Sequence, residues 1–172
     1  MNNTTNDSVL NAAGRFSSFS YLGWNGLLLL IMMLLGIIAA IALPSSSPNT
    51  NPDLPIFAMI ILGILYIALI YFSFLFAVRR LHDRNHSGWL SLLMLVPLVN
   101  IAMALYLTFA KGDDRTNQYG APRNTRTWEK VLGWIYLLIF PIGILAAIAI
   151  PAYQDYVQRA DQGQIEIQQK AE

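Results

Sequence analysis

Residues 79–90 read Arg79-Arg80-Leu81-His82-Asp83-Arg84-Asn85-His86-Ser87-Gly88-Trp89-Leu90. This stretch brings three Arg, two His and one Asp together between two long apolar segments. Basic residues concentrate in the short loops that connect membrane-spanning helices, so we expect the cluster at a boundary between water and lipid. The stretch therefore predicts an integral membrane protein whose helices meet at a polar loop.

The composition of the whole chain agrees with a membrane location. Of its 172 residues, 55% are hydrophobic and only 12% are charged, whereas soluble domains contain about 25% charged residues. The net charge of +1 gives no extended basic surface, so nucleic acid is not expected as a partner. The absence of Cys excludes thiol catalysis, disulfides and Cys-ligated zinc. We expect neither a separate soluble domain nor a cofactor.

Four apolar runs predict the fold class, an all-α bundle of about four membrane helices. At a rise of about 1.5 Å per residue, a run of about twenty residues covers the hydrocarbon core of a bilayer. The runs are residues 22–43, 55–78, 88–110 and 131–152. We expect three parts: a polar disordered tail over 1–20, the bundle over 21–122, and a connector with a final helix over 123–172, which continues into water.

The distribution of Lys and Arg orients this bundle. Residues 44–53 contain none, which places that loop outside and the N-terminus in the cytoplasm. A third run that spans fully leaves six basic residues inside and five outside, whereas a run that turns back at Pro97–Asn100 gives nine and two. The count favours a re-entrant hairpin, and a kinked full span of 23 residues stays open as the alternative.

Several motifs occur in a familiar order between residues 14 and 122. The order and spacing resemble the "domain of unknown function 805" family of small bacterial inner-membrane proteins. The resemblance implies a location in the plasma membrane and brings no activity with it. The motifs are Gly14-Arg15-Phe16-Ser17, Arg79-Arg80-Leu81-His82-Asp83, Ser87-Gly88-Trp89, Pro97 and Asn117-Gln118-Tyr119-Gly120.

A second resemblance concerns residues 143–160, which are similar to the N-terminal helix of type IV pilins. A prepilin carries a Gly before its cleavage point and a Glu within the mature helix, and this chain has Glu129 and Trp134 there. We therefore expect no processing by a prepilin peptidase. Pilin helices begin at the cytoplasmic side, and that orientation agrees with the hairpin topology.

The polar loop supplies the first group of candidate functional residues. His82 and His86 are spaced to share a helix face and could bind a metal, but further ligands are missing nearby and the Arg side chains would repel a cation. We expect no metal, with Asp83 paired to Arg79 or Arg80. The remaining Arg would then meet anionic lipid headgroups at about 1 kcal/mol each. The candidates are Arg79, Arg80, His82, Asp83, Arg84, His86 and Trp89.

Trp89 follows Ser87-Gly88 and is expected to anchor the loop at the interface. Although Ser87 is close to His82 and Asp83 in sequence, adjacency does not make a catalytic triad, and we expect no enzyme.

Polar or small residues within the apolar runs form the second group. Asn25 and Asn100 are candidates for hydrogen bonds between helices, and Pro97 marks the break in the third run. Small residues at a spacing of four let helices approach closely in lipid. On the fourth run these are Gly143, Ala147 and Pro151, which could dock a pilin-like helix or pack within their own bundle.

Two functional hypotheses follow. The first is a non-enzymatic inner-membrane adaptor or regulator that contacts type IV pilins or pilus assembly proteins through residues 143–160. The second is a small transporter, channel or lipid-handling protein that uses the Arg/His loop and the broken third run.

Overall fold

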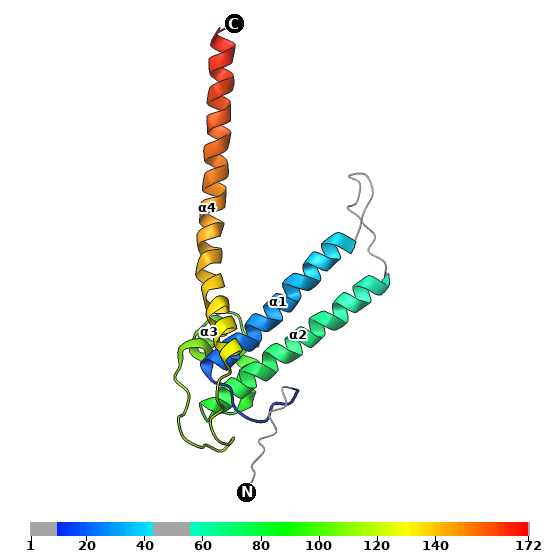
Figure 1. The fold of residues 1–172 in the computed structure, drawn as a ribbon, viewed down its shortest axis with the longest axis vertical. Coiled ribbons are helices and arrows are strands. Elements are labelled where there is room, and N and C mark those ends of the chain that lie inside the picture. The colour runs from blue at the N-terminus through cyan, green and yellow to red at the C-terminus, as the bar shows by residue number, and fades with distance from the viewer. Residues whose placement is uncertain (1–9, 43–55, 172) are drawn as a thin grey trace. The chain divides into compact units, whose positions relative to one another are not determined.

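The computed structural model describes residues 10–42 and 56–171 of the chain. They form the helices α1 (Ser18–Ala42), α2 (Ile56–Asp83), η1 (Gly88–Leu95), α3 (Val99–Phe109) and α4 (Thr127–Ala171) (Figure 1). These residues form no β-strand. Three helices are long and apolar enough to cross a membrane, over Ser18–Ala39, Ile56–Asp83 and Thr127–Gly163. The predicted all-α fold class is confirmed.

The third apolar run is broken into two short helices. Pro97 lies in the break, and Leu98 adopts a φ of +68° before α3 begins. That conformation costs a residue other than glycine about 1–3 kcal/mol. With eight residues in η1 and eleven in α3, neither piece is long enough to cross a bilayer.

Both ends of the broken run lie beside the end of α2. Gly88 follows α2 after a short turn, and the Arg80 side chain donates hydrogen bonds to the carbonyls of Leu107 and Ala110 at the far end of α3. The Asp113 N–H then donates to the carbonyl of Asp83 at 2.9 Å. The run is therefore a hairpin, which is the topology that the charge count favoured over a full span.

The apolar core is small and lies where these segments meet. It combines apolar side chains from the segment before α1 and from α1, α2 and α3. Its buried members are Phe16, Tyr21, Leu22, Leu75, Phe76, Ala77, Leu81, Met103 and Leu107. Along much of α1 and α2 the large apolar side chains are exposed, as expected of surfaces that face lipid.

The segment before α1 belongs to this core. Arg15 and Phe16 of this segment are at most 1% exposed, as is Ser20 in the first turn of α1. The Phe16 N–H donates to the carbonyl of Arg79 at 2.9 Å. The segment before α1 therefore finds its partners on α2. Residues 1–9 of the expected tail lie outside the described residues.

The chain divides into two compact units, and the boundary falls within α4 after Tyr136. The first turns of α4 belong with the bundle. Within the second unit α4 is a continuous helix that includes Pro141 and Pro151. Many of its large apolar side chains are exposed, among them Phe140 at 75% and Ile148 at 67%.

Close approach of α1 to the start of α4 depends on glycine. A Cβ atom on Gly23 would lie 2.4 Å from the backbone oxygen of Glu129, and one on Gly133 would lie 3.1 Å from the ring of Phe19. Only a residue without a side chain fits at Gly23. By contrast, a Cβ on Gly36 or Gly143 would meet nothing within 4 Å.

Candidate functional site: a buried polar cap

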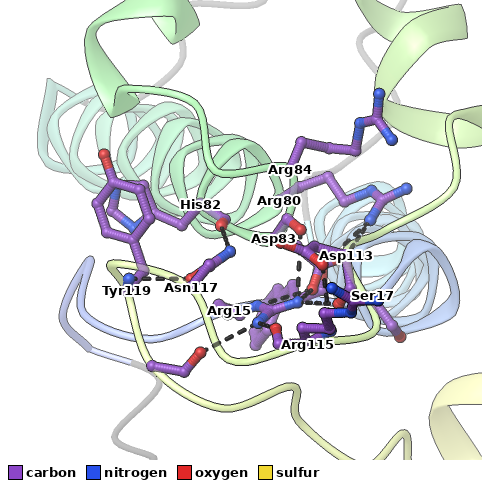
Figure 2. A network of polar contacts seen from close by, with 12 residues as sticks. Arg15, Ser17, Arg80, His82, Asp83, Arg84, Asp113, Arg115, Asn117 and Tyr119 are labelled. Atoms are coloured by element: carbon purple, nitrogen blue, oxygen red, sulfur yellow. Dashed lines mark hydrogen bonds and ion pairs between the residues drawn. The ribbon is translucent and has the colours of Figure 1, made fainter.

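The end of α2 carries a carboxylate between two buried arginines. Asp83 Oδ1 lies 3.0 Å from Arg15 Nη2, and Asp83 Oδ2 lies 2.6 Å from Arg80 Nη1 (Figure 2). The three side chains are almost completely buried. Arg80 and Asp83 are three residues apart on α2, which confirms one of the two pairings expected from the sequence. Arg15 comes from the segment before α1 and adds a second cation that the local pattern did not indicate.

Arg15 also binds the loop that follows α3. Its Nη1 donates to the carbonyls of Arg115 at 2.7 Å and Gly120 at 3.0 Å, and its Nη2 donates to the carbonyl of Asp113. A guanidinium has five N–H donors in one plane, so a single Arg can serve several acceptors in this way. Arg15 thereby fastens the loop to α2.

Arg80 does the same for the hairpin. In addition to Asp83 and the two carbonyls at the end of α3, it donates to Ser18 Oγ at 2.6 Å and to the carbonyl of Phe16 at 3.4 Å. Arg80 thus joins α2, α3 and the start of α1. Removing the charge partner of such a buried group is costly, because the group cannot regain water.

A second carboxylate lies at the start of α4. Glu129 is fully buried and accepts from Ser20 Oγ at 2.9 Å and from Trp24 Nε1 at 3.1 Å, both on α1. Arg123 binds its two oxygens at 2.8 and 3.0 Å, and the Arg126 N–H donates at 3.0 Å. Glu129 therefore caps its own helix and ties it to α1.

We use the name polar cap for Arg15, Arg80, Asp83, Arg123 and Glu129. Glu129 and Arg123 were not expected as functional residues. One local signal was available: a Glu in the third helical position that reaches back to the residue before the helix is half of a capping box. Its contacts with α1 had no such signal, since Ser20 and Trp24 are more than a hundred residues away in sequence.

The two His residues of the loop have different surroundings. The ring of His82 stacks on Tyr119 with centroids 3.7 Å apart, and Asn117 Nδ2 donates to the carbonyl of His82 at 2.9 Å. His86 Nε2 lies 2.7 Å from the hydroxyl of Tyr106 on α3, which also accepts from Arg84 Nε at 3.1 Å. Within the described residues, no three His, Cys, Asp or Glu are grouped in a way that could hold a metal ion.

Comparison with known proteins identifies the family of this chain. Residues 9–121 match the family described as Protein of unknown function (DUF805). The chain belongs to this family. The match includes Arg15, the polar loop and the hairpin, and it ends before Glu129. No curated protein and no solved structure matches the chain, so the resemblance to type IV pilins at residues 143–160 stays a prediction.

Arg80 is the partner of Asp83, so the arginines expected to meet lipid headgroups are Arg79 and Arg84, and for Arg79 that expectation is wrong. In this DUF805 chain Arg79 is 1% exposed and Arg80 is fully buried. The Arg79 guanidinium lies over the Phe16 ring at 4.1 Å, while Arg80 is held by carbonyls and Asp83. Protein groups thus take the places that headgroups would occupy. Arg84 is half-buried against Tyr106, and Trp89 is 80% exposed, as an interfacial anchor would be.

The intramembrane candidates take part in few contacts. Asn25 Nδ2 donates to the carbonyl of Tyr21 in its own helix at 2.8 Å, which is not the inter-helix bond that we expected. Pro97 and Asn100 are exposed at the hairpin break. The candidate docking face of α4, formed by Gly143, Ala147 and Pro151, is exposed within its own unit.

Outside the spans, the pair Lys111 and Asp114 offers a contrast to the buried network. Lys111 Nζ lies 2.6 Å from Asp114 Oδ2, and both side chains are at least 75% exposed. Its hydrogen bond to Lys111 lowers the pKa of Asp114, and the same bond raises the pKa of Lys111. An ion pair this exposed is worth little to stability.

Proposed function

We propose that this protein is a non-enzymatic adaptor of the bacterial inner membrane, with its N-terminus in the cytoplasm. Its polar cap holds the base of α4, and the rest of α4 contacts type IV pilins or pilus assembly proteins. The observation that carries the proposal is the contrast along α4. Glu129 and Gly133 are packed against α1, whereas beyond Tyr136 the helix is a separate unit with exposed apolar side chains.

The chemistry of the exposed stretch supports a helical partner. Gly143, Ala147 and Pro151 recur every four residues and are exposed, and small residues at this spacing allow a second helix to approach closely in lipid. The similarity of residues 143–160 to a pilin helix suggests which helices would fit. The network at the base gives the adaptor a fixed attachment, since the contacts of Glu129 with Ser20 and Trp24 and of Arg123 with Ser20 must break before α4 can leave α1.

Photo-crosslinking in the native membrane tests this proposal. A photoreactive residue at Ala147 should give adducts with a pilin or a pilus assembly protein, identified by mass spectrometry. The matched control is the same residue at Leu145, which is also exposed and points about 160° away around the helix. Adducts with lipid alone from both positions, or the same proteins from both, would contradict a specific docking face.

A transporter or channel is the alternative, built on the Arg/His loop and the hairpin. Arg79 and Arg80 are already engaged with protein groups, so a transported solute would have to displace those contacts. A lipid-handling protein, the other form of this alternative, could bind lipid without displacing the contacts of Arg79 and Arg80.

A further inference from the structure

An open groove of about 470 Å³ lies between the last turns of α2 and the start of η1. Val78 and His82 line it from α2, and Gly88, Trp89 and Leu92 line it from η1. Gly88 allows this arrangement, because a Cβ there would lie 2.7 Å from Val78 Cγ1 and 3.2 Å from His82 Nε2. The groove is thus part of the packing between the two helices and is separate from α4.

The lining of the groove is amphipathic. Polar groups come from His82, Ser87, Ser91 and Tyr119, and the remaining lining is apolar. His82 is 9% exposed, and its Nδ1 is buried without a hydrogen-bond partner of good geometry in the described residues, although the backbone of Ala12 and Gly14 lies beside the ring. Such a lining suits a ligand with one polar and one apolar end.

The depth of the groove matches the interface of a bilayer. The candidate span of α2 ends at Asp83, one residue after His82. Trp89 is 80% exposed and Leu92 is 48% exposed beside the groove. Exposed Trp side chains near the end of a span favour the headgroup level. The polar lining therefore lies where the phosphate and glycerol of a phospholipid would be.

None of the described Lys or Arg residues lines the groove, but the end of the bundle that contains it carries an excess of positive charge, which favours an anionic occupant. Between residues 10 and 136, the described part of the chain contains nine Lys or Arg and four Asp or Glu, a difference of +5. All of these residues belong to the segment before α1, the end of α2 and the turn after it, the loop after α3 or the first turns of α4. This excess of positive charge at one end of the bundle attracts anionic lipid.

We propose that the groove between α2 and η1 binds the phosphate and glycerol of an anionic phospholipid, whose acyl chains run along Trp89 and Leu92. The headgroup lies against Ser87, Ser91 and Tyr119. This site is independent of the adaptor function, because it includes no residue of α4.

The test uses the full chain labelled with 5-fluorotryptophan in detergent micelles. The ¹⁹F resonance of Trp89, assigned with a Trp89→Phe variant, is followed while short-chain phosphatidylglycerol or phosphatidylcholine is added. We expect a saturable shift at a phosphatidylglycerol concentration about five-fold lower than for phosphatidylcholine, the factor that one nearby basic residue contributes. The resonances of Trp24, Trp128 and Trp134 serve as internal references.

Two neighbouring variants locate the effect. Ala12 is exposed and lines the groove, so Ala12→Phe fills it and should abolish the saturable shift. Ala13 is also exposed but does not line the groove, and Ala13→Phe should leave the shift unchanged. If Ala12→Phe does not fold, His82→Phe replaces it, since a phenyl ring can keep the stack on Tyr119.

Three results would overturn the proposal. The first is equal affinity for the two lipids, and the second is an equal loss in both Ala variants. The third is displacement of phosphatidylglycerol by inorganic phosphate at the same concentration, which would assign the groove to a soluble phosphate compound. None of these results bears on crosslinking at Ala147, so the two proposals fail separately.

Discussion

The polar cap and residues 137–163 of α4 use charge and apolar surface in opposite ways. In the cap, charged side chains are buried and each binds groups from two or more segments, as Arg15 and Glu129 do. In the described part of residues 137–163 most side chains are exposed, and the ion pair that occurs there, Arg159 with Asp155, is an exposed contact one helical turn long. The charged groups of the cap are thus paired within the protein, whereas the exposed apolar side chains of residues 137–163 need lipid or a partner to cover them.

The largest effect should come from removing the carboxylate of Asp83. The variant Asp83→Ala leaves Arg15 and Arg80 buried without their shared anion, which should cost about 3–5 kcal/mol in the free energy of unfolding. Denaturant unfolding in mild detergent, followed by circular dichroism, measures this change.

The control is Asp114→Ala in the exposed pair with Lys111, and it should give no measurable change. Equal midpoints for the two variants would mean that burial in the cap adds nothing, and the distinction between the two regions would fail.

The spans and the hairpin could be predicted because local properties of the sequence determine them. Apolar runs have the length that a bilayer requires, and Pro97 together with the count of basic residues indicated that the third run turns back. The pair of Arg80 and Asp83 was also predictable, since residues three apart lie on one helix face.

The rest of the polar cap depends on contacts between distant segments. Arg15 reaches Asp83 across 68 residues, and Trp24 reaches Glu129 across 105, and no periodicity connects such positions. The same limit explains the error for Arg79. An Arg at the end of a span can face headgroups or protein, and the choice depends on whether another segment supplies carbonyl groups.

A smaller effect is expected for Glu129→Gln. The amide keeps the shape of the side chain but cannot accept from Arg123, Ser20, Trp24 and the Arg126 N–H together, so we expect a loss of about 1.5–3 kcal/mol, the range for hydrogen bonds to charged groups. The same unfolding measurement applies. The matched variant Asp155→Asn in the exposed pair with Arg159 should be neutral; a comparable loss there would show that α4 beyond Tyr136 is held as firmly as its base.

The smallest effect is expected for glycine substitutions, where the change in the free energy of unfolding should differ in sign between the base of α4 and residues 137–163. In Gly23→Ala the new Cβ would lie 2.4 Å from a backbone oxygen of Glu129, so α1 and the base of α4 must separate, at a cost of about 1–3 kcal/mol. Gly143→Ala places a Cβ where nothing lies within 4 Å. There the better helix propensity of Ala should leave stability unchanged or raise it by up to about 1 kcal/mol. A loss at both positions would reveal a neighbour of Gly143 within the folded protein, and α4 would then lack an open face for a partner helix.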